Sequence, residues 1–160
     1  MQNAKLRGVF EDLGFANVMS VISSGNVLFE SERTDIAGLE ADIEARLLTQ
    51  LGFHSTTIIR SRAQLEALVR KQPFGDAVHS PKQYLTVTFL KTPQTVQDLA
   101  PKLADRMVAT YPDTVCCVVD TTTSRTPDLM AWLEKAYSKQ ITTRTWLTVQ
   151  RILKRWGSPG

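Results

Sequence analysis

The chain has 160 residues, of which 42% are hydrophobic and 22% are charged, and its formal net charge is +3. This length fits one domain or two small halves that share a core, and this composition excludes a disordered chain. No run approaches the roughly 20 apolar residues that cross a bilayer, so we expect no contact with a membrane. The first residues contain no apolar signal-peptide core, and we therefore expect a cytoplasmic protein.

The first elements predicted along the chain are a helix and a β-hairpin. The helix face is formed by apolar residues at helical spacing, namely Leu6, Val9, Phe10 and Leu13. Two runs rich in Val, Ile, Leu and Phe follow at about 17–22 and 27–31. The turn residues Ser24-Gly25-Asn26 lie between them, and this pattern is typical of a tight hairpin.

A second helix and a strand are predicted to complete the first half. Thr34 is the expected N-cap of the helix, and Gly52 is the expected end. The β-branched segment Ser55–Arg60 predicts a strand. The next residues, Ser61-Arg62-Ala63-Gln64, form the pattern of a capping box, which predicts that a short helix begins there.

The second half begins after a linker at 72–83 that contains Pro and Gly. Strands are predicted at 84–91, 107–110, 114–119 and 140–142. Helices are predicted to begin at Thr92-Pro93 and Thr126-Pro127, because a capping threonine precedes a proline. Thr143 is the expected cap of a last helix. The resulting order of elements is β-α-β-β-α-β followed by a helix.

These orders predict an α+β fold built from tandem ferredoxin-like (βαββαβ) subdomains, of which the first lacks its opening strand. The predicted parts are residues 1–61, a connecting helix and linker at 62–83, and residues 84–160. The missing strand would be central in the sheet, so we expect that the natural chain extends upstream of Met1 or that another strand fills the gap. The alternative is that the first half has a different α+β arrangement.

Several stretches carry a resemblance to a known family. They are Glu11–Phe15, the hairpin Ile22–Phe29, Leu65–Leu68 with Gln72-Pro73-Phe74, Tyr84–Leu90, and Ile141–Val149. In this order and spacing the chain resembles the domain-of-unknown-function family 1697 of bacterial proteins, over nearly its whole length. The resemblance implies two tandem ferredoxin-like subdomains that exchange C-terminal strands, and it implies no established activity.

The chain departs from the family pattern in two places. The family opens with a strand and a Leu-Arg-Gly-Ile-Asn-Val-Gly-Gly stretch that this chain lacks, in agreement with the missing strand. The family also has asparagines on either side of the tryptophan, where this chain has Thr145 and Leu147 around Trp146. A site that used those amides is therefore in question here.

One candidate binding element is the turn formed by Ser24, Gly25 and Asn26. A hydroxyl and backbone N–H groups can converge there into a small anion-binding nest. The alternative is a plain hairpin turn, in which Gly25 supplies the positive φ and Asn26 tolerates one. The second reading is favoured.

The other candidate element is formed by Thr142, Thr143, Arg144 and Thr148, which are expected at the N-terminus of the last helix. A helix N-terminus offers free N–H groups and a positive partial charge, and an arginine adds a bidentate fork for phosphate or carboxylate. The alternative is a capped helix whose arginine is solvated or paired with Asp120 or Asp128.

No other group of residues indicates chemistry. Cys116 and Cys117 are adjacent and are expected to be reduced packing residues, and His54 and His79 have no metal-ligand spacing. None of the common nucleophile, P-loop or zinc-protease motifs occurs. We therefore expect no metal and no cofactor, and whether the protein is an enzyme stays open.

The sequence thus predicts a binding domain for a small anionic or phosphate-bearing ligand, held near Arg144 and the Ser24–Asn26 turn. Two alternatives stay open. One is a single-stranded nucleic-acid-binding domain, because the stretch from Lys135 to Arg155 is basic. The other is a protein-interaction module, in which an unpaired sheet edge would favour a homodimer.

Overall fold

The computed structural model describes residues 3–22, 25–93, 107–122, 126–137 and 140–156. These residues form an α+β protein with two antiparallel sheets and five helices, which confirms the predicted fold class. The chain folds as two compact units. Unit 1 consists of Met1–Ile59 with Lys154–Gly160, and unit 2 consists of Arg60–Leu153.

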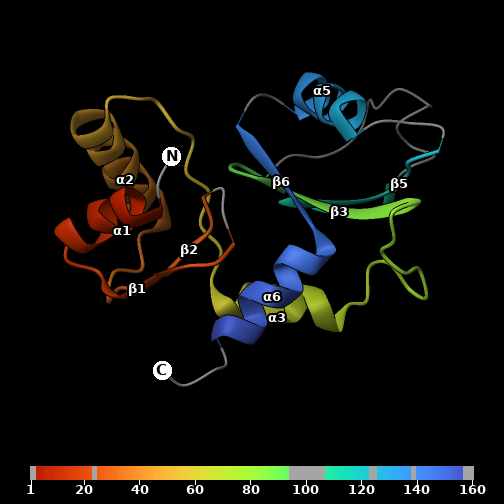
Figure 1. Cartoon of the computed structure of the whole chain (residues 1–160), viewed down its shortest axis with the longest axis horizontal. Helices are drawn as coiled ribbons and strands as arrows, with labels where there is room; N and C mark the ends of the chain where they lie inside the picture. The colour runs from red at the N-terminus through yellow and green to blue at the C-terminus, as the bar shows by residue number, and fades with distance from the viewer. Residues whose placement is uncertain (1–2, 23–24, 94–106, 123–125, 138–139, 157–160) are drawn as a thin grey trace. The chain divides into compact units, whose positions relative to one another are not determined.

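Unit 1 contains two helices and the predicted hairpin (Figure 1). Its elements are α1 (Asn3–Asp12), β1 (Ala16–Ser20), β2 (Val27–Glu30) and α2 (Ile36–Leu51). The hairpin is confirmed, with β1 and β2 antiparallel. The core is formed by the predicted stripe of α1 and by Ile43 and Leu47 of α2. Phe29 of β2 packs on this core and stacks on Phe15 with 4.5 Å between ring centroids.

The predicted strand Ser55–Arg60 is wrong, because residues 53–60 are described and belong to no strand. A strand needs a neighbour for its ladder hydrogen bonds. In a βαββαβ sheet the last strand pairs only with the first, and the described residues contain no strand before α1. The amide of Ile59 instead donates to Oε2 of Glu40 at 2.9 Å.

The predicted cap of α2 is also wrong by one residue. The N-cap is Asp35 rather than Thr34, and its side chain makes no capping hydrogen bond. The Asp35 carboxylate binds the guanidinium of Arg33 at 2.8 Å instead, and this bond lowers the pKa of Asp35. The predicted end at Gly52 is confirmed by its left-handed φ of 79°.

Unit 2 contains a four-stranded antiparallel sheet with the order β4-β5-β3-β6. Its elements are α3 (Arg62–Arg70), β3 (Gln83–Leu90), β4 (Met107–Tyr111), β5 (Thr114–Asp120), α5 (Thr126–Tyr137), β6 (Ile141–Thr145) and all but the last turn of α6 (Trp146–Trp156). The helix predicted after Thr92-Pro93 falls mostly on 94–106, outside the described residues.

Both faces of this sheet are covered by helices (Figure 1). On the α5 side, Leu133 packs with alternate strand residues such as Leu90 and Cys117. On the other side lie α3 and α6. There the ring of Trp146 packs edge-on against Phe74, with 5.1 Å between the ring centroids. Neighbouring strand residues face opposite sides, so the two cysteines point to different layers. Both are buried and free, as expected for packing residues.

The predicted start of the last helix is wrong by two residues. Thr143 is not a cap but part of β6, in which Thr142 pairs with Phe89 and Thr145 pairs with Thr86. The helix begins at Trp146. The hydroxyl of Thr145 accepts a bond from the amide of Thr148 at 3.3 Å, and Thr145 therefore does the capping expected of Thr143.

Candidate functional site

The described residues of the predicted hairpin site, Gly25 and Asn26, lie in the connection between β1 and β2. Gly25 has a φ of +83°, and the carbonyl of Asn26 accepts a hydrogen bond from the amide of Val21 at 3.0 Å. These are the contacts of a hairpin connection, for which glycine is favoured because it adopts positive φ without strain. Ser24 lies outside the described residues. An anion nest at this turn stays a prediction.

Thr142, Thr143 and Arg144 lie on β6, and Thr148 lies in the first turn of α6. The guanidinium of Arg144 donates to the hydroxyl of Thr142 at 2.6 Å and to the carbonyl of Thr143 at 3.0 Å. Burial lowers the pKa of Arg144. The hydroxyl of Thr143 bonds that of Thr88 at 2.8 Å, on the opposite face of the sheet. The structure therefore does not gather these residues around one helix terminus.

The two halves of the predicted site also belong to different units. Gly25 and Asn26 are in unit 1, whereas Thr142, Thr143, Arg144 and Thr148 are in unit 2. That they act together on one ligand stays a prediction.

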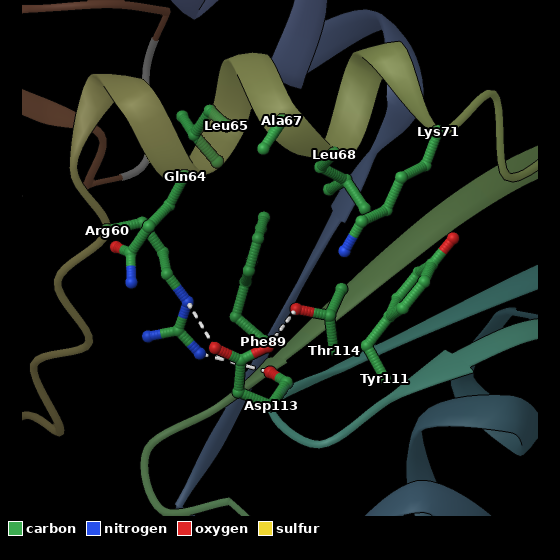
Figure 2. A pocket seen from close by; sticks show the side chains of 10 residues that line it. All are labelled: Arg60, Gln64, Leu65, Ala67, Leu68, Lys71, Phe89, Tyr111, Asp113 and Thr114. Atoms are coloured by element: carbon green, nitrogen blue, oxygen red, sulfur yellow. Dashed lines mark hydrogen bonds and ion pairs between the residues drawn. The ribbon is translucent and has the colours of Figure 1, made fainter.

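Unit 2 contains a cavity that the sequence did not indicate (Figure 2). Its volume is about 160 Å³, and it lies between α3 and the sheet, where β3 ends and β4 turns into β5. It is lined by Arg60, Gln64, Leu65, Ala67, Leu68, Lys71, Phe89, Tyr111, Asp113 and Thr114. Apolar side chains of α3 form one wall, and polar groups surround the opening.

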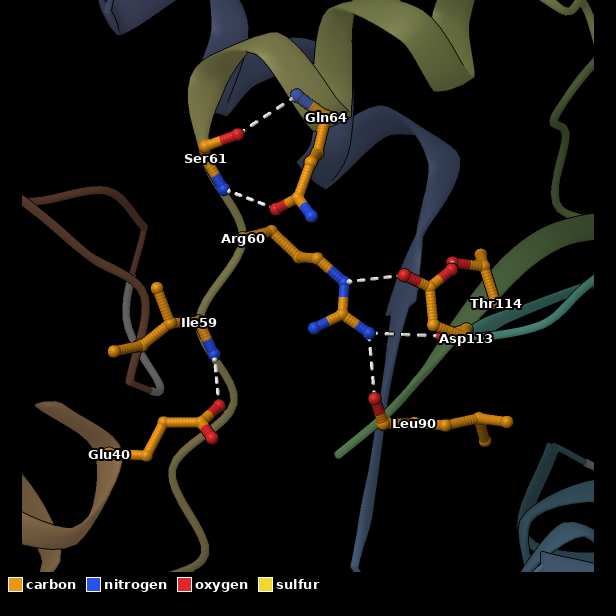
Figure 3. A network of polar contacts seen from close by, with 8 residues as sticks. All are labelled: Glu40, Ile59, Arg60, Ser61, Gln64, Leu90, Asp113 and Thr114. Atoms are coloured by element: carbon orange, nitrogen blue, oxygen red, sulfur yellow. Dashed lines mark hydrogen bonds and ion pairs between the residues drawn. The ribbon is translucent and has the colours of Figure 1, made fainter. Parts of the chain in front are cut away.

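Arg60 is the most constrained of the cavity cations (Figure 3). Its side chain is 13% exposed, and its Nη2 donates to the carbonyls of Leu90 at 2.7 Å and Asp113 at 3.0 Å. Its Nε lies 3.8 Å from Oδ2 of Asp113, and its guanidinium lies 5.5 Å from the ring centroid of Phe89. The guanidinium of Arg60 therefore lies closer to two backbone carbonyl oxygens than to the carboxylate of Asp113.

A capping box fixes the start of α3, the helix that lies over the cavity (Figure 3). The hydroxyl of Ser61 accepts a bond from the amide of Gln64 at 3.1 Å, and Oε1 of Gln64 accepts one from the amide of Ser61 at 2.8 Å. This confirms the predicted box. The side-chain oxygen of Gln64 is used in the cap, and Gln64 is also one of the residues that line the cavity.

Lys71 is the second cation of the cavity. Its Nζ lies 4.4 Å from the ring centroid of Tyr111 and, within the part of the chain that the structure describes, it makes no ion pair. Burial raises the pKa of Tyr111, and the charge of Cys116 adds to the shift, so the phenol stays neutral at pH 7. Two cations and one carboxylate leave the cavity with one net positive charge.

The sequence could not identify these residues because they converge from distant positions. Arg60 and Asp113 are separated by 53 positions, and no short motif joins them. The one local signal was the capping box, which fixes where α3 begins but not what it covers. Among the described residues, no group of His, Cys, Asp and Glu is arranged to hold a metal ion.

The comparisons with known proteins place the chain in a family. A family model described as "Protein of unknown function (DUF1697)" matches residues 1–115. The chain belongs to the DUF1697 family. The matched range contains all of the cavity residues and the Gly25-Asn26 turn, and it ends before β6. No curated protein and no solved structure matches this DUF1697 chain. None of the helices in its described part is long and apolar enough to cross a membrane.

Proposed function

We propose that this DUF1697 chain is a binding domain for a small anionic ligand, and that the ligand binds in the cavity beneath α3. The observation that carries the proposal is the net positive charge of a cavity in which Lys71 has no carboxylate partner among the described residues. An exposed ammonium at the edge of a largely apolar cavity is a suitable donor for a carboxylate or a phosphate group.

The size of the cavity limits the ligand. Its volume of about 160 Å³ is below the roughly 300–1,000 Å³ of sites that enclose drug-sized molecules. A whole nucleotide therefore exceeds it. A compact acid, or the acidic end of a larger molecule, fits.

Arg144 remains a second place for an anion, but the observed contacts favour it less. Its Nη1 is within hydrogen-bonding distance of Thr142 and Thr143, so an incoming anion would compete with two existing acceptors. The predicted sharing of one ligand by Arg144 and the Ser24–Asn26 turn would also require unit 1 and unit 2 to act together.

The test compares Lys71→Met with Lys82→Met. Lys82 is exposed and precedes β3, whereas the cavity lies near Phe89, at the other end of that strand. Small carboxylates and inorganic phosphate are titrated while the backbone amide signals of Gln64, Leu68 and Thr114 are followed by NMR. One charge-assisted hydrogen bond contributes about 1.5–3 kcal/mol, so we expect Lys71→Met to weaken binding by about 10- to 100-fold.

Lys82→Met is expected to bind as the parent protein does. Equal affinities for Lys71→Met and the parent would refute the proposal, as would a titration in which no anion shifts the signals around the cavity. A uniform loss in both variants would show a general charge effect rather than a site.

The nucleic-acid alternative has less support in unit 2. Single-stranded RNA commonly stacks on aromatic residues of an open sheet face. Here helices lie on both faces of the sheet (Figure 1). Its aromatic residues Phe89 and Tyr111 line the cavity beneath α3, and Tyr84 packs on the core of the α5 side. A homodimer through an unpaired strand edge also stays a proposal, supported by the two-stranded sheet of unit 1.

The finer fold and the location are part of the same proposal. A ferredoxin-like arrangement of unit 2 is supported by the order β4-β5-β3-β6 and by its antiparallel pairing. A bacterial origin is supported by the resemblance of the chain. A cytoplasmic location is supported by two buried cysteines that form no disulfide.

A further inference from the structure

The walls of the cavity are mainly apolar. Leu65 and Leu68 of α3 and Phe89 of β3 are all buried residues, and Ala67 leaves space between α3 and the sheet. Figure 2 shows the Phe89 ring in the middle of the site, with Arg60 and Gln64 on one side and Lys71 and Tyr111 on the other. A ligand that fills this space must pack against the apolar walls and also pair with the positive charge of the cavity.

The volume matches one six-membered ring. An engineered apolar cavity of about 150 Å³ in another protein binds benzene, and the cavity here measures about 160 Å³. A bare phosphate or acetate ion would leave the apolar walls without contacts. A flat ring would lie against Phe89 and Leu68, in the offset or edge-on contact that aromatic groups prefer.

The charges favour a monoanion. Arg60 is held by the carbonyls of Leu90 and Asp113, and the Asp113 carboxylate lies beside it. Lys71 therefore supplies the charge available to a ligand. A phosphate dianion would place a second negative charge near Asp113, and like charges at short range repel. A single carboxylate matches the one net positive charge.

We infer, provided that the proposed anion site is correct, that the cavity selects an aromatic monocarboxylate of about the size of benzoate. Its carboxylate accepts a hydrogen bond from Nζ of Lys71, and its ring lies beneath α3 against Phe89 and Leu68. The same geometry accepts the benzoate-like end of a larger molecule whose remainder extends through the opening.

The test uses four probes and two matched substitutions. Benzoate, acetate, inorganic phosphate and benzyl alcohol are titrated into the whole chain, and the cavity amides are followed by NMR. Ala67→Leu fills the space beneath α3, whereas Ala63→Leu places the same side chain at an exposed position of the same helix. Leucine is a good helix former, so both variants are expected to fold, and their amide spectra without ligand check this.

We expect the parent to bind benzoate at least tenfold more tightly than acetate, phosphate or benzyl alcohol. We expect Ala67→Leu to lose benzoate binding and Ala63→Leu to keep it. If acetate or phosphate binds in the cavity as tightly as benzoate, the inference is overturned while the anion site stands. If benzyl alcohol binds as tightly as benzoate, or if no anion binds there, both the inference and the proposed function fail.

Discussion

The contacts of Arg60 make a prediction about which interaction holds the cavity together. Arg60→Met removes the guanidinium but keeps an unbranched apolar chain to lie against Phe89. Asp113→Asn removes the carboxylate charge but keeps the backbone carbonyl of residue 113 and an oxygen that accepts from Thr114. The two substitutions therefore separate the carbonyl hydrogen bonds of Arg60 from its ion pair.

The expected magnitudes differ several-fold. A hydrogen bond from a charged group contributes about 1.5–3 kcal/mol, and Arg60 donates such bonds to the carbonyls of Leu90 and Asp113. After Arg60→Met, the carbonyl of Asp113 still accepts a hydrogen bond from the amide of Leu90 at 2.9 Å. The larger part of the loss is therefore expected at the carbonyl of Leu90, which loses its 2.7 Å bond to the guanidinium. We expect Arg60→Met to lower the free energy of unfolding by about 3 kcal/mol.

The ion pair contributes much less. Its Nε–Oδ2 distance is 3.8 Å and the Asp113 side chain is 39% exposed, so solvent screens the charges. A long ion pair whose carboxylate is open to solvent contributes about 0.2–1 kcal/mol, and we expect about 0.5 kcal/mol or less from Asp113→Asn.

Urea unfolding followed by tryptophan fluorescence measures both variants. Trp132 and Trp146 lie in unit 2, so the signal reports mainly the unit that contains Arg60. With an m-value of about 2 kcal/mol/M, Arg60→Met lowers the midpoint by about 1.5 M at unchanged m. If Asp113→Asn costs as much as Arg60→Met, the ion pair is the main interaction and the reasoning is refuted.

Two further predictions concern the cap of α3 and the buried thiol. Ser61→Ala removes the acceptor for the Gln64 amide and is expected to lower the free energy of unfolding in urea by about 1 kcal/mol. Ser61→Asn keeps a side-chain acceptor and is expected to retain most of the parent's stability. Equal stabilities of the alanine variant and the parent would contradict the cap. Burial raises the pKa of Cys116 from 9.0 to about 12, with a smaller contribution from Cys117. Above pH 9 the unfolded thiol therefore loses its proton before the folded one, so folding stability is fully present below pH 9 and falls by up to about 1.4 kcal/mol per pH unit towards pH 12. Unfolding curves from pH 7 to pH 11 should show a shallower loss for Cys116→Ala, and parallel losses would contradict the assignment.

The sequence predicted well those features that a few neighbouring residues decide. The hairpin around Gly25-Asn26 was found because its turn needs a residue that tolerates positive φ. The start of α3 was found because Ser61 and Gln64 satisfy one another's amides within four positions. In each case the interacting groups lie within a few positions of one another in the chain, so the local sequence pattern is sufficient to predict the contact.

Features that depend on a distant partner were predicted poorly. Ser55–Arg60 has the composition of a strand, but composition supplies no neighbour for its ladder hydrogen bonds. Thr143 and Thr145 are equally good caps by residue type. Residues Thr142–Thr145 pair with β3 and so belong to the sheet. The helix therefore begins after Thr145, which caps α6.

The candidate site shows the same division. By itself the sequence determined the α+β class, the family resemblance, the hairpin and the ends of several helices, because these follow from local periodicity, turn chemistry and capping. Only the tertiary structure decided that Arg60, Lys71 and Tyr111 line one cavity and that Arg144 lies on a strand. The physical reason is that a cavity is formed by side chains from α3, β3 and the β4–β5 turn, whose proximity depends on sheet register and helix packing rather than on spacing along the chain.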